Sequence, residues 1–192
     1  SSSFNQNESF SSSSASKTEK SPIYLAVENK NVEIIKALIS DPDIDVNIEY
    51  KNERSSSTKN NNQANYDTIQ IDKKSAIYLA IEHENIEIVK LLLQQKNIDL
   101  NLICENNNKE MKTPLYLAVE NKKIEIIKLL LENPNIDVNI QSGTKGDNGK
   151  YENKLLTHST PLHLAIKKHN TEIIKQLLKN SKININEKDE NG

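Results

Sequence analysis

The stretch that decides the fold reads TPLYLAVENKKIEIIKLLL and covers residues 113–131. Thr113 can cap a helix through its hydroxyl oxygen, and Pro114 suits the first helical position, where the missing N–H is not needed. The apolar residues that follow predict a short first helix ending near Asn121. A second helix from Ile124 is apolar on more than one side, so neighbouring elements must cover it on more than one side.

Near-copies of this stretch occur four times along the chain. They start at Ser21, Ser75, Thr113 and Thr160, and they read SPIYLAVENKNVEIIKALI, SAIYLAIEHENIEIVKLLL, TPLYLAVENKKIEIIKLLL and TPLHLAIKKHNTEIIKQLL. Each is followed by a short apolar alternation, such as Ile136–Val138 after the third copy. A helix pair repeated in tandem cannot bury its own apolar face and must stack on its neighbours. The repeats therefore predict an all-α solenoid of four stacked helix-turn-helix units.

This pattern resembles the ankyrin repeat, a unit of about 33 residues with a turn, two helices and a TPLHxA phrase. The phrase is intact at Thr160–Ala165, and a second-helix phrase of the form E-I-I/V-K-x-L-I/L follows in each copy. The resemblance covers roughly residues 21–192, which we take as one ankyrin-repeat domain after a disordered serine-rich tail at residues 1–20. It implies four stacked ankyrin repeats with enlarged hairpin, or finger, loops.

Two places depart from the family pattern. The turn between the helices, where the family usually has glycine, holds Lys30, Glu84, Lys122 and His169. Either the array carries the strain of left-handed non-glycine residues, about 1–2 kcal/mol each, or the turn differs. Only His163 keeps the motif histidine, and the other copies have Tyr24, Tyr78 and Tyr116. The resemblance implies that this side chain forms hydrogen bonds that tie adjacent repeats, so the tyrosines should keep a polar tip near the repeat junction.

The repeats are unevenly spaced because three inserts lie between the closing asparagine of one repeat and the next first helix. The inserts span residues 48–74, 102–112 and 140–159. In the first insert we expect the polar stretch ERSSSTKNNNQAN to be mobile. We expect the alternation in Tyr66–Ile71 to form a strand, as half of a lengthened hairpin whose other half is Val46–Tyr50. The inserts are either neutral expansions or extended fingers that grip a partner. The gripping residues would be Tyr50, Tyr66, Tyr151 and Leu155.

Composition and motifs argue against an enzyme. Charged residues make up 27% of the chain and the net charge is −2, so bulk charge gives no argument for nucleic-acid binding. No apolar run approaches the ~20 residues that span a bilayer, and the single cysteine, Cys104, fits a reducing compartment. The glycine-rich stretch from Gly143 lacks the spacing of a phosphate loop, and Asp43–Asn47 lacks the glycine of a calcium loop. We therefore expect no catalytic residue, cofactor, metal, small-molecule substrate, nucleic acid or membrane, and an intracellular, cytoplasmic location.

The resemblance implies a partner-binding face at the exposed pair of residues after each TPLHLAA-like phrase. The pairs are Glu28 and Asn29, Glu82 and His83, Glu120 and Asn121, and Lys167 and Lys168. If they line one groove, it is acidic over three repeats and basic at its C-terminal end. A protein or peptide with a basic segment is the matching partner. The alternative is a solvated face with no binding role.

We interpret the chain as a non-enzymatic protein–protein interaction scaffold that binds a partner on its concave face. The alternative is a regulatory or targeting module of a larger enzyme, such as a kinase or a ubiquitin ligase subunit. The last helix, near Thr171–Lys179, has no obviously polar outer face, although the terminal repeats of solenoids normally need one. We therefore expect a fragment of a longer array, or a flank that something else covers.

Overall fold

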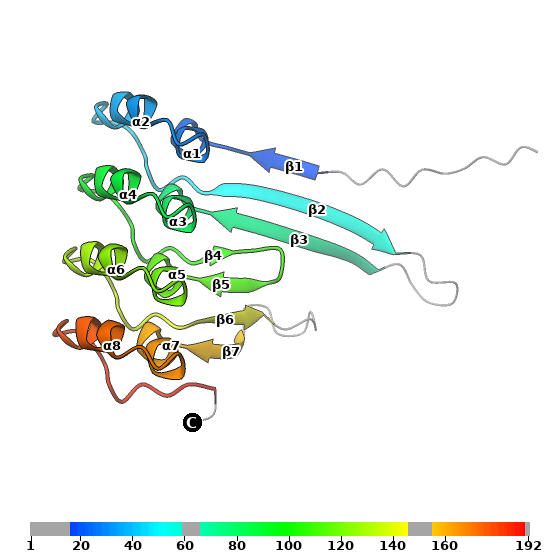
Figure 1. Cartoon of the computed structure of the whole chain (residues 1–192). Helices are drawn as coiled ribbons and strands as arrows, with labels where there is room; N and C mark the ends of the chain where they lie inside the picture. The colour runs from blue at the N-terminus through cyan, green and yellow to red at the C-terminus, as the bar shows by residue number, and fades with distance from the viewer. Residues whose placement is uncertain (1–15, 59–65, 146–154, 191–192) are drawn as a thin grey trace, which may run out of the picture.

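The computed structural model of the chain describes residues 16–58, 66–145 and 155–190. Its helices form two rows, with the first helix of every pair in one row and the second helix in the other (Figure 1). The first row contains α1 (Pro22–Glu28), α3 (Ala76–Glu82), α5 (Pro114–Glu120) and α7 (Pro161–Lys167). The second row contains α2 (Val32–Ile39), α4 (Ile86–Leu93), α6 (Ile124–Leu131) and α8 (Thr171–Leu178). Each helix packs against its partner and its row neighbours, which confirms the predicted stack of four repeats.

Local sequence determines where the helices begin. Each first helix has a hydroxyl N-cap that accepts a hydrogen bond from the backbone N–H three residues later, at Ser21, Ser75, Thr113 and Thr160. Three second helices are capped in the same way by Asn31, Asn85 and Asn170. Such caps each contribute about 1 kcal/mol to stability. The repeated phrase therefore specifies these helix starts locally, whereas α6, whose N-cap residue is Lys123, has no side-chain cap.

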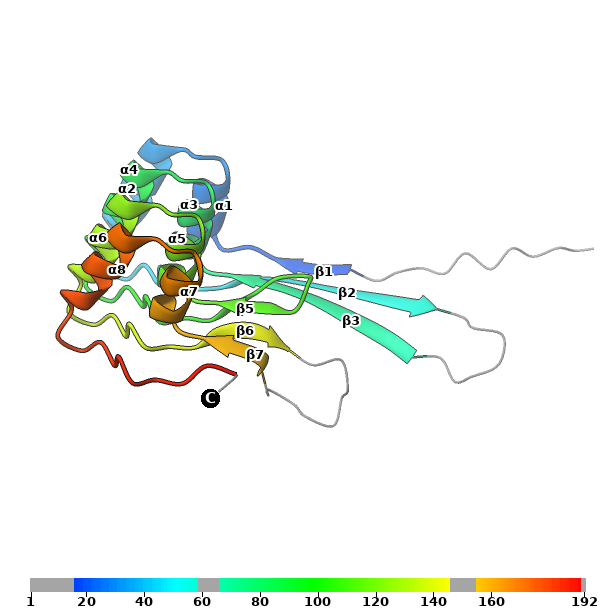
Figure 2. The same ribbon diagram turned by 60° about the horizontal axis from the view of Figure 1, so that its bottom comes forward.

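The fingers between the helix pairs form one antiparallel sheet, a feature that the all-α prediction does not contain. In the described part of the chain its strands are neighbours in chain order: β1 (Ser16–Glu19), β2 (Tyr50–Thr58), β3 (Tyr66–Lys74), β4 (Cys104–Glu105), β5 (Glu110–Lys112), β6 (Ser142–Lys145) and β7 (Leu155–Ser159). The sheet extends away from the first row of helices (Figure 2). The enlarged fingers thus add a second surface beside the helices.

The first insert and the N-terminal segment differ in part from expectation. A hairpin forms in this insert as predicted, but its first strand is β2 (Tyr50–Thr58), which shares only Tyr50 with the predicted segment 46–50. Residues 53–58, which we expected to be mobile, form the outer half of β2, because β3 offers them a strand to pair with residue for residue. The expected tail enters the sheet at β1, which pairs with β2. Residues 1–15 of that tail lie outside the described residues.

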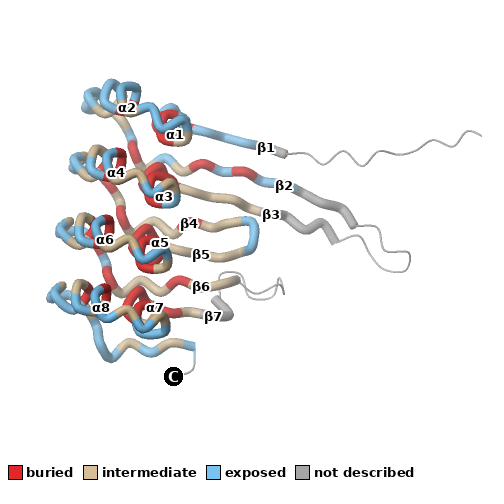
Figure 3. Tube along the Cα trace, in the orientation of Figure 1, coloured by how far each residue is buried: buried red, intermediate tan, exposed pale blue. Residues whose placement is uncertain are grey.

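The closing segments of the first three repeats contain residues that are buried in the core (Figure 3). Val46, Leu100 and Val138 are buried, and the asparagine after each of them bridges to the closing segment of the following repeat. Each asparagine donates to a backbone carbonyl at 2.7–2.9 Å and accepts from a backbone N–H at 2.8 Å. We call this series the closing-asparagine ladder; its members are Asn47, Asn101 and Asn139.

The turns between paired helices contain backbone strain, which was one of the two alternatives predicted from the sequence. The residues that stand in for glycine have positive φ angles: Lys30 (54°), Glu84 (56°), Lys122 (56°) and His169 (51°). A left-handed conformation costs a residue with a Cβ about 1–2 kcal/mol, and glycine avoids this cost. Each repeat therefore holds one locally unfavourable residue that the surrounding packing keeps in place.

We expect Lys122→Gly to raise the free energy of unfolding by about 1 kcal/mol and the melting temperature by about 2–4 °C. Lys122 is exposed, so the substitution removes little packing. The matched control is Lys128→Gly, at an exposed position inside α6, which should lower stability by about 0.5–1 kcal/mol. Thermal unfolding followed by circular dichroism measures both. If both substitutions destabilise the protein, the prediction that Lys122 is strained in its left-handed conformation is wrong.

Candidate interaction surface

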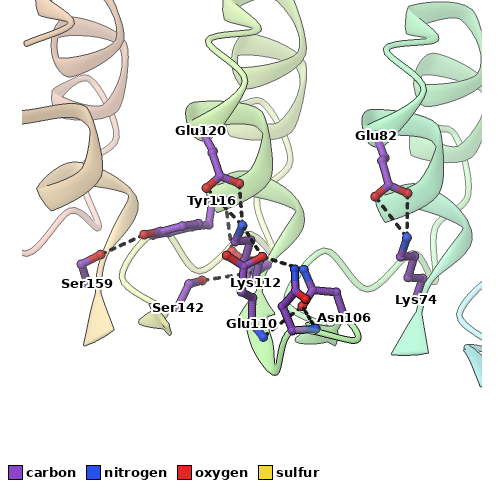
Figure 4. A network of polar contacts seen from close by, with 11 residues as sticks. Lys74, Glu82, Asn106, Glu110, Lys112, Tyr116, Glu120, Ser142 and Ser159 are labelled. Atoms are coloured by element: carbon purple, nitrogen blue, oxygen red, sulfur yellow. Dashed lines mark hydrogen bonds and ion pairs between the residues drawn. The ribbon is translucent and has the colours of Figure 1, made fainter. Parts of the chain in front are cut away.

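A lysine–glutamate ion pair recurs at the same place in the first three repeats. The lysine directly precedes the N-cap of the first helix, and the glutamate is the last residue of that helix. The pairs are Lys20–Glu28 (2.8 Å), Lys74–Glu82 (2.9 Å) and Lys112–Glu120 (2.8 Å). The pairs of repeats 2 and 3 lie where the first row of helices meets the sheet (Figure 4). The three predicted glutamates thus occupy equivalent places on one surface, but a lysine of the same repeat binds each of them.

A second carboxylate joins this ion pair in repeats 2 and 3. Lys74 Nζ lies 3.9 Å from Asp72 Oδ1, and Lys112 Nζ lies 3.1 Å from Glu110 Oε2. Repeat 4 builds the same composition from other positions, because Lys167 contacts two acidic side chains at 2.9 and 3.2 Å. Each group combines one ammonium with two carboxylates and so has one surplus negative charge. We call these groups the carboxylate triads: Asp72–Lys74–Glu82, Glu110–Lys112–Glu120 and Asp189–Lys167–Glu190.

In the triads of repeats 2 and 3, the glutamate that ends the helix is more exposed than the lysine that it binds. The side chains of Glu82 and Glu120 are 40% and 31% exposed, whereas those of Lys74 and Lys112 are 16% and 13% exposed. The lysines therefore neutralise the glutamates from beneath, and the oxygens remain accessible. The surface seen from solvent is acidic in these two repeats even though each glutamate is ion-paired.

Hydrogen bonds and burial shift the pKa values of the triad side chains in different directions. Burial raises the pKa of Asp72 and outweighs the attraction of Lys74. The side-chain amide of Asn106 donates to Glu110 at 2.6 Å and lowers its pKa. Burial lowers the pKa of Lys112, but its hydrogen bonds to Glu120 and Glu110 outweigh burial and raise the net pKa. The lysine of repeat 3 therefore stays charged at neutral pH and holds its two carboxylates in place.

The second residue of each predicted pair is the C-cap of its first helix. These residues are Asn29, His83, Asn121 and Lys168. Asn29 and Asn121 are exposed, and His83 is half-buried, with an Nδ1 atom that has no hydrogen-bond partner in the described part of the chain. The expected basic end does not stand alone, because Asp189 and Glu190 bind Lys167. Sequence reasoning missed these two acids, which reach the lysine from the following finger.

The finger residues proposed to grip a partner are placed differently from expectation. Tyr50 is buried, and its ring stacks on the ring of Tyr24 with 4.7 Å between the two centroids. The ammonium nitrogen of Lys20 lies 5.6 Å from the centroid of the Tyr50 ring. Tyr50 therefore packs the base of the finger and presents little surface to a partner.

The other proposed gripping residues belong to the first and third inserts. Tyr66 is the first residue of β3 and Leu155 is the first residue of β7, and the structure describes the backbone but not the side chain of each. Tyr151 lies outside the described residues.

One motif tyrosine, and not the motif histidine, ties adjacent repeats. The hydroxyl of Tyr116 hydrogen-bonds Ser159 Oγ at 3.0 Å, directly before the first helix of repeat 4. His163 Nδ1 accepts from the backbone N–H of Thr160 at 3.3 Å, and the backbone N–H of His163 donates to Thr160 Oγ1 at 3.4 Å, which makes a capping box within one repeat. The implied junction bond is thus present at Tyr116, and His163 stabilises a helix start.

Groups that could carry other chemistry have local structural roles. Cys104 is buried, its Sγ accepts from the backbone N–H of Ser75 at 3.4 Å, and burial raises its pKa to about 11. Within residues 16–58, 66–145 and 155–190, no group of three His, Cys, Asp or Glu side chains could hold a metal ion. Among the helices of those residues, none is long and apolar enough to cross a membrane.

Comparison with known proteins relates most of the chain to one repeat family. A model of three ankyrin repeats matches residues 53–142, and a model of a single ankyrin repeat matches residues 18–51 and 157–190. Among solved structures, the chain resembles EF0377, an ankyrin repeat protein, with a TM-score of 0.56 and 17% identity. The match covers 88% of this chain and 65% of that one, and at this identity it concerns the fold alone. No curated protein matches the chain.

Proposed function

The chain belongs to the ankyrin-repeat family, and from that premise we propose that it is a non-enzymatic scaffold binding a protein partner on its concave face. Ankyrin repeats are generally protein–protein interaction modules. The site we propose is the surface where the first row of helices meets the sheet, with the carboxylate triads at its centre. An intracellular location is part of the proposal, because one cysteine permits no internal disulfide.

The outward position of Glu82 and Glu120 is the main support for this proposal. Rigid elements hold them, since each ends a first helix and is tied to the strand before that helix. A binding group held in this way loses little conformational entropy when a ligand arrives. In repeats 1 to 3 the glutamate is more exposed than its lysine, so a ligand that lies across these repeats meets one acidic position after another. In repeat 4 Lys167 is the most exposed member of its group.

The partner that fits is an extended protein segment with lysine or arginine side chains. One surplus negative charge in each of three consecutive repeats matches cationic groups spaced along such a segment. Exposed ion pairs contribute only about 0–1 kcal/mol each, so several must act together. Complementary charge of this kind speeds association and selects partners more than it raises affinity alone.

We expect the triple variant Glu28→Gln, Glu82→Gln, Glu120→Gln to bind such a partner about tenfold more weakly, since three exposed pairs together contribute about 1.4 kcal/mol. Glutamine is preferred to lysine here because a lysine already lies beside each glutamate. Partners captured by the full chain are identified by mass spectrometry, and the tightest one is titrated against purified variants by calorimetry.

The matched control removes the same charge from equivalent exposed glutamates of the second row, through Glu33→Gln, Glu87→Gln and Glu125→Gln. We expect the control to bind within about twofold of the wild type, because its side chains lie on the other row of helices. Equal weakening by both variants would indicate a general charge effect. Unchanged binding by the variant of Glu28, Glu82 and Glu120 would indicate that the partner binds elsewhere.

A further inference from the structure

The first repeat exposes two apolar side chains whose counterparts are buried in the inner repeats. Leu25 is 40% exposed and Ile34 is 50% exposed. Their counterparts in repeats 2 and 3 are at most 6% exposed: Leu79, Ile88, Leu117 and Ile126. What differs is that a preceding repeat covers the inner positions, whereas no described repeat precedes the first. We call Leu25 and Ile34 the leading flank.

The fourth repeat exposes the complementary set. Ile166 is 52% exposed and Ile185 is 66% exposed. Their counterparts are at most 2% exposed: Val27, Ile81 and Val119 for Ile166, and Val46, Leu100 and Val138 for Ile185. In those repeats the following repeat covers the side chains. We call Ile166 and Ile185 the trailing flank.

Polar groups at the two ends match as well. Asn186 follows Ile185, at the place that Asn47, Asn101 and Asn139 hold in the closing-asparagine ladder. The ladder bonds go to a backbone carbonyl and a backbone N–H in the next closing segment, and repeat 1 has these groups at Asp43 and Asp45. Within the described part of the chain, neither Asn186 nor these two groups form a ladder bond.

We propose that the trailing flank of one molecule docks on the leading flank of a second copy of this chain. The contact would continue an interface that is already present, because the same kinds of surface meet three times between repeats of one molecule. The contact between molecules would reproduce an inner repeat junction, with Ile166 and Ile185 covered by Leu25 and Ile34, and with Asn186 bonded to the backbone at Asp43 and Asp45. Such a contact is head-to-tail and leaves a free flank at each end, so association continues beyond a dimer.

Sedimentation velocity of the full chain over a wide concentration range tests this proposal. We expect the average mass to rise past that of a dimer. A leading-flank variant (Leu25→Glu, Ile34→Glu) and a trailing-flank variant (Ile166→Glu, Ile185→Glu) should each be monomeric alone. Their equimolar mixture should form a dimer and nothing larger, because each supplies the flank that the other lacks. Asn186→Ala should weaken wild-type association about tenfold by removing two hydrogen bonds.

Two results would overturn the proposal. A wild-type chain that stays monomeric at every concentration shows that the flanks do not bind each other, whatever else covers them. A wild type that stops at a dimer, with a mixture of variants that stays monomeric, indicates a contact between identical surfaces. The substituted side chains are exposed, and circular dichroism verifies that both variants keep the wild-type helix content.

Discussion

Replacing Ile126 with alanine is expected to lower the free energy of unfolding by about 2–5 kcal/mol, a large part of the 5–15 kcal/mol typical of a domain. Ile126 lies in α6 of the third repeat and is almost fully buried. Truncating a buried isoleucine removes apolar contacts and leaves a cavity that the packed neighbours fill only in part. In a solenoid the loss weakens a repeat that holds its neighbours together, so its effect extends along the array.

The matched control is the same substitution at Ile34, the counterpart of Ile126 in repeat 1. Ile34 is half exposed, so its truncation should lower stability by less than about 1 kcal/mol. Urea unfolding followed by circular dichroism, at low protein concentration to suppress association, compares the two variants. Equal losses would show that helix propensity, and not burial between repeats, determines the contribution of this position.

The helix pairs could be predicted from sequence because their signals are local and repeated. The hydroxyl caps act within one turn, and each apolar phrase recurs in a copy that confirms it. The strand at Tyr66–Ile71 was also visible, through its alternation. The partner strand was not, because residues 53–58 are polar and have no pattern of their own. Their structure comes from pairing with β3.

The interaction surface could be predicted only in part. Equivalence between repeats placed Glu28, Glu82 and Glu120 on one face, because the same repeat position lies at the same place in each unit. The lysines beside them carried a readable signal, since one directly precedes the helix cap in three repeats, and it was missed. The partners of Lys167 could not be read in this way, because they come from the following finger.

Tyr50 illustrates a different limit. Its position in an insert suggested an exposed aromatic side chain, and no repeat position gives it a counterpart tyrosine in the other fingers. In the structure its ring stacks on Tyr24, a residue of another element. A contact between two aromatic rings from separate elements depends on where the finger leaves the stack, and this geometry has no signature in local sequence.

Cys104 in the folded chain is expected to react with a thiol reagent at pH 8 at least about 100-fold more slowly than in the unfolded chain. Only the thiolate reacts, and burial raises the pKa from its ordinary 9.0 to about 11. The two-unit difference reduces the thiolate fraction about 100-fold at this pH, and burial of the sulfur adds to the protection. Reaction kinetics with and without urea measure the ratio. Comparable rates would show that the thiol is accessible.

The same thiol should make the fold less stable in alkali. Between pH 9 and 11 the unfolded chain releases the thiol proton while the folded chain keeps it, so the unfolded state binds fewer protons and the free energy of unfolding falls as pH rises. Below pH 9 the thiol is protonated in both states, so Cys104 lowers the free energy of unfolding very little. By pH 11 the loss of unfolding free energy attributable to Cys104 reaches about 2 kcal/mol. Burial also raises the pKa of Tyr24 and Tyr78, which adds a loss of the same sign at higher pH.

Cys104→Ser separates the contribution of the thiol from that of the tyrosines. Repeat 3 has a serine at this position, and the hydroxyl of Ser142 accepts from the backbone N–H of Thr113 at 3.3 Å, as Cys104 accepts from Ser75. The substitution therefore keeps the local bond and removes the titrating group. Urea unfolding at pH 8 and pH 11 should show that the variant loses about 2 kcal/mol less than the wild type over this interval. Parallel losses in the two proteins would assign the alkaline instability to the tyrosines alone, because their titration is common to both.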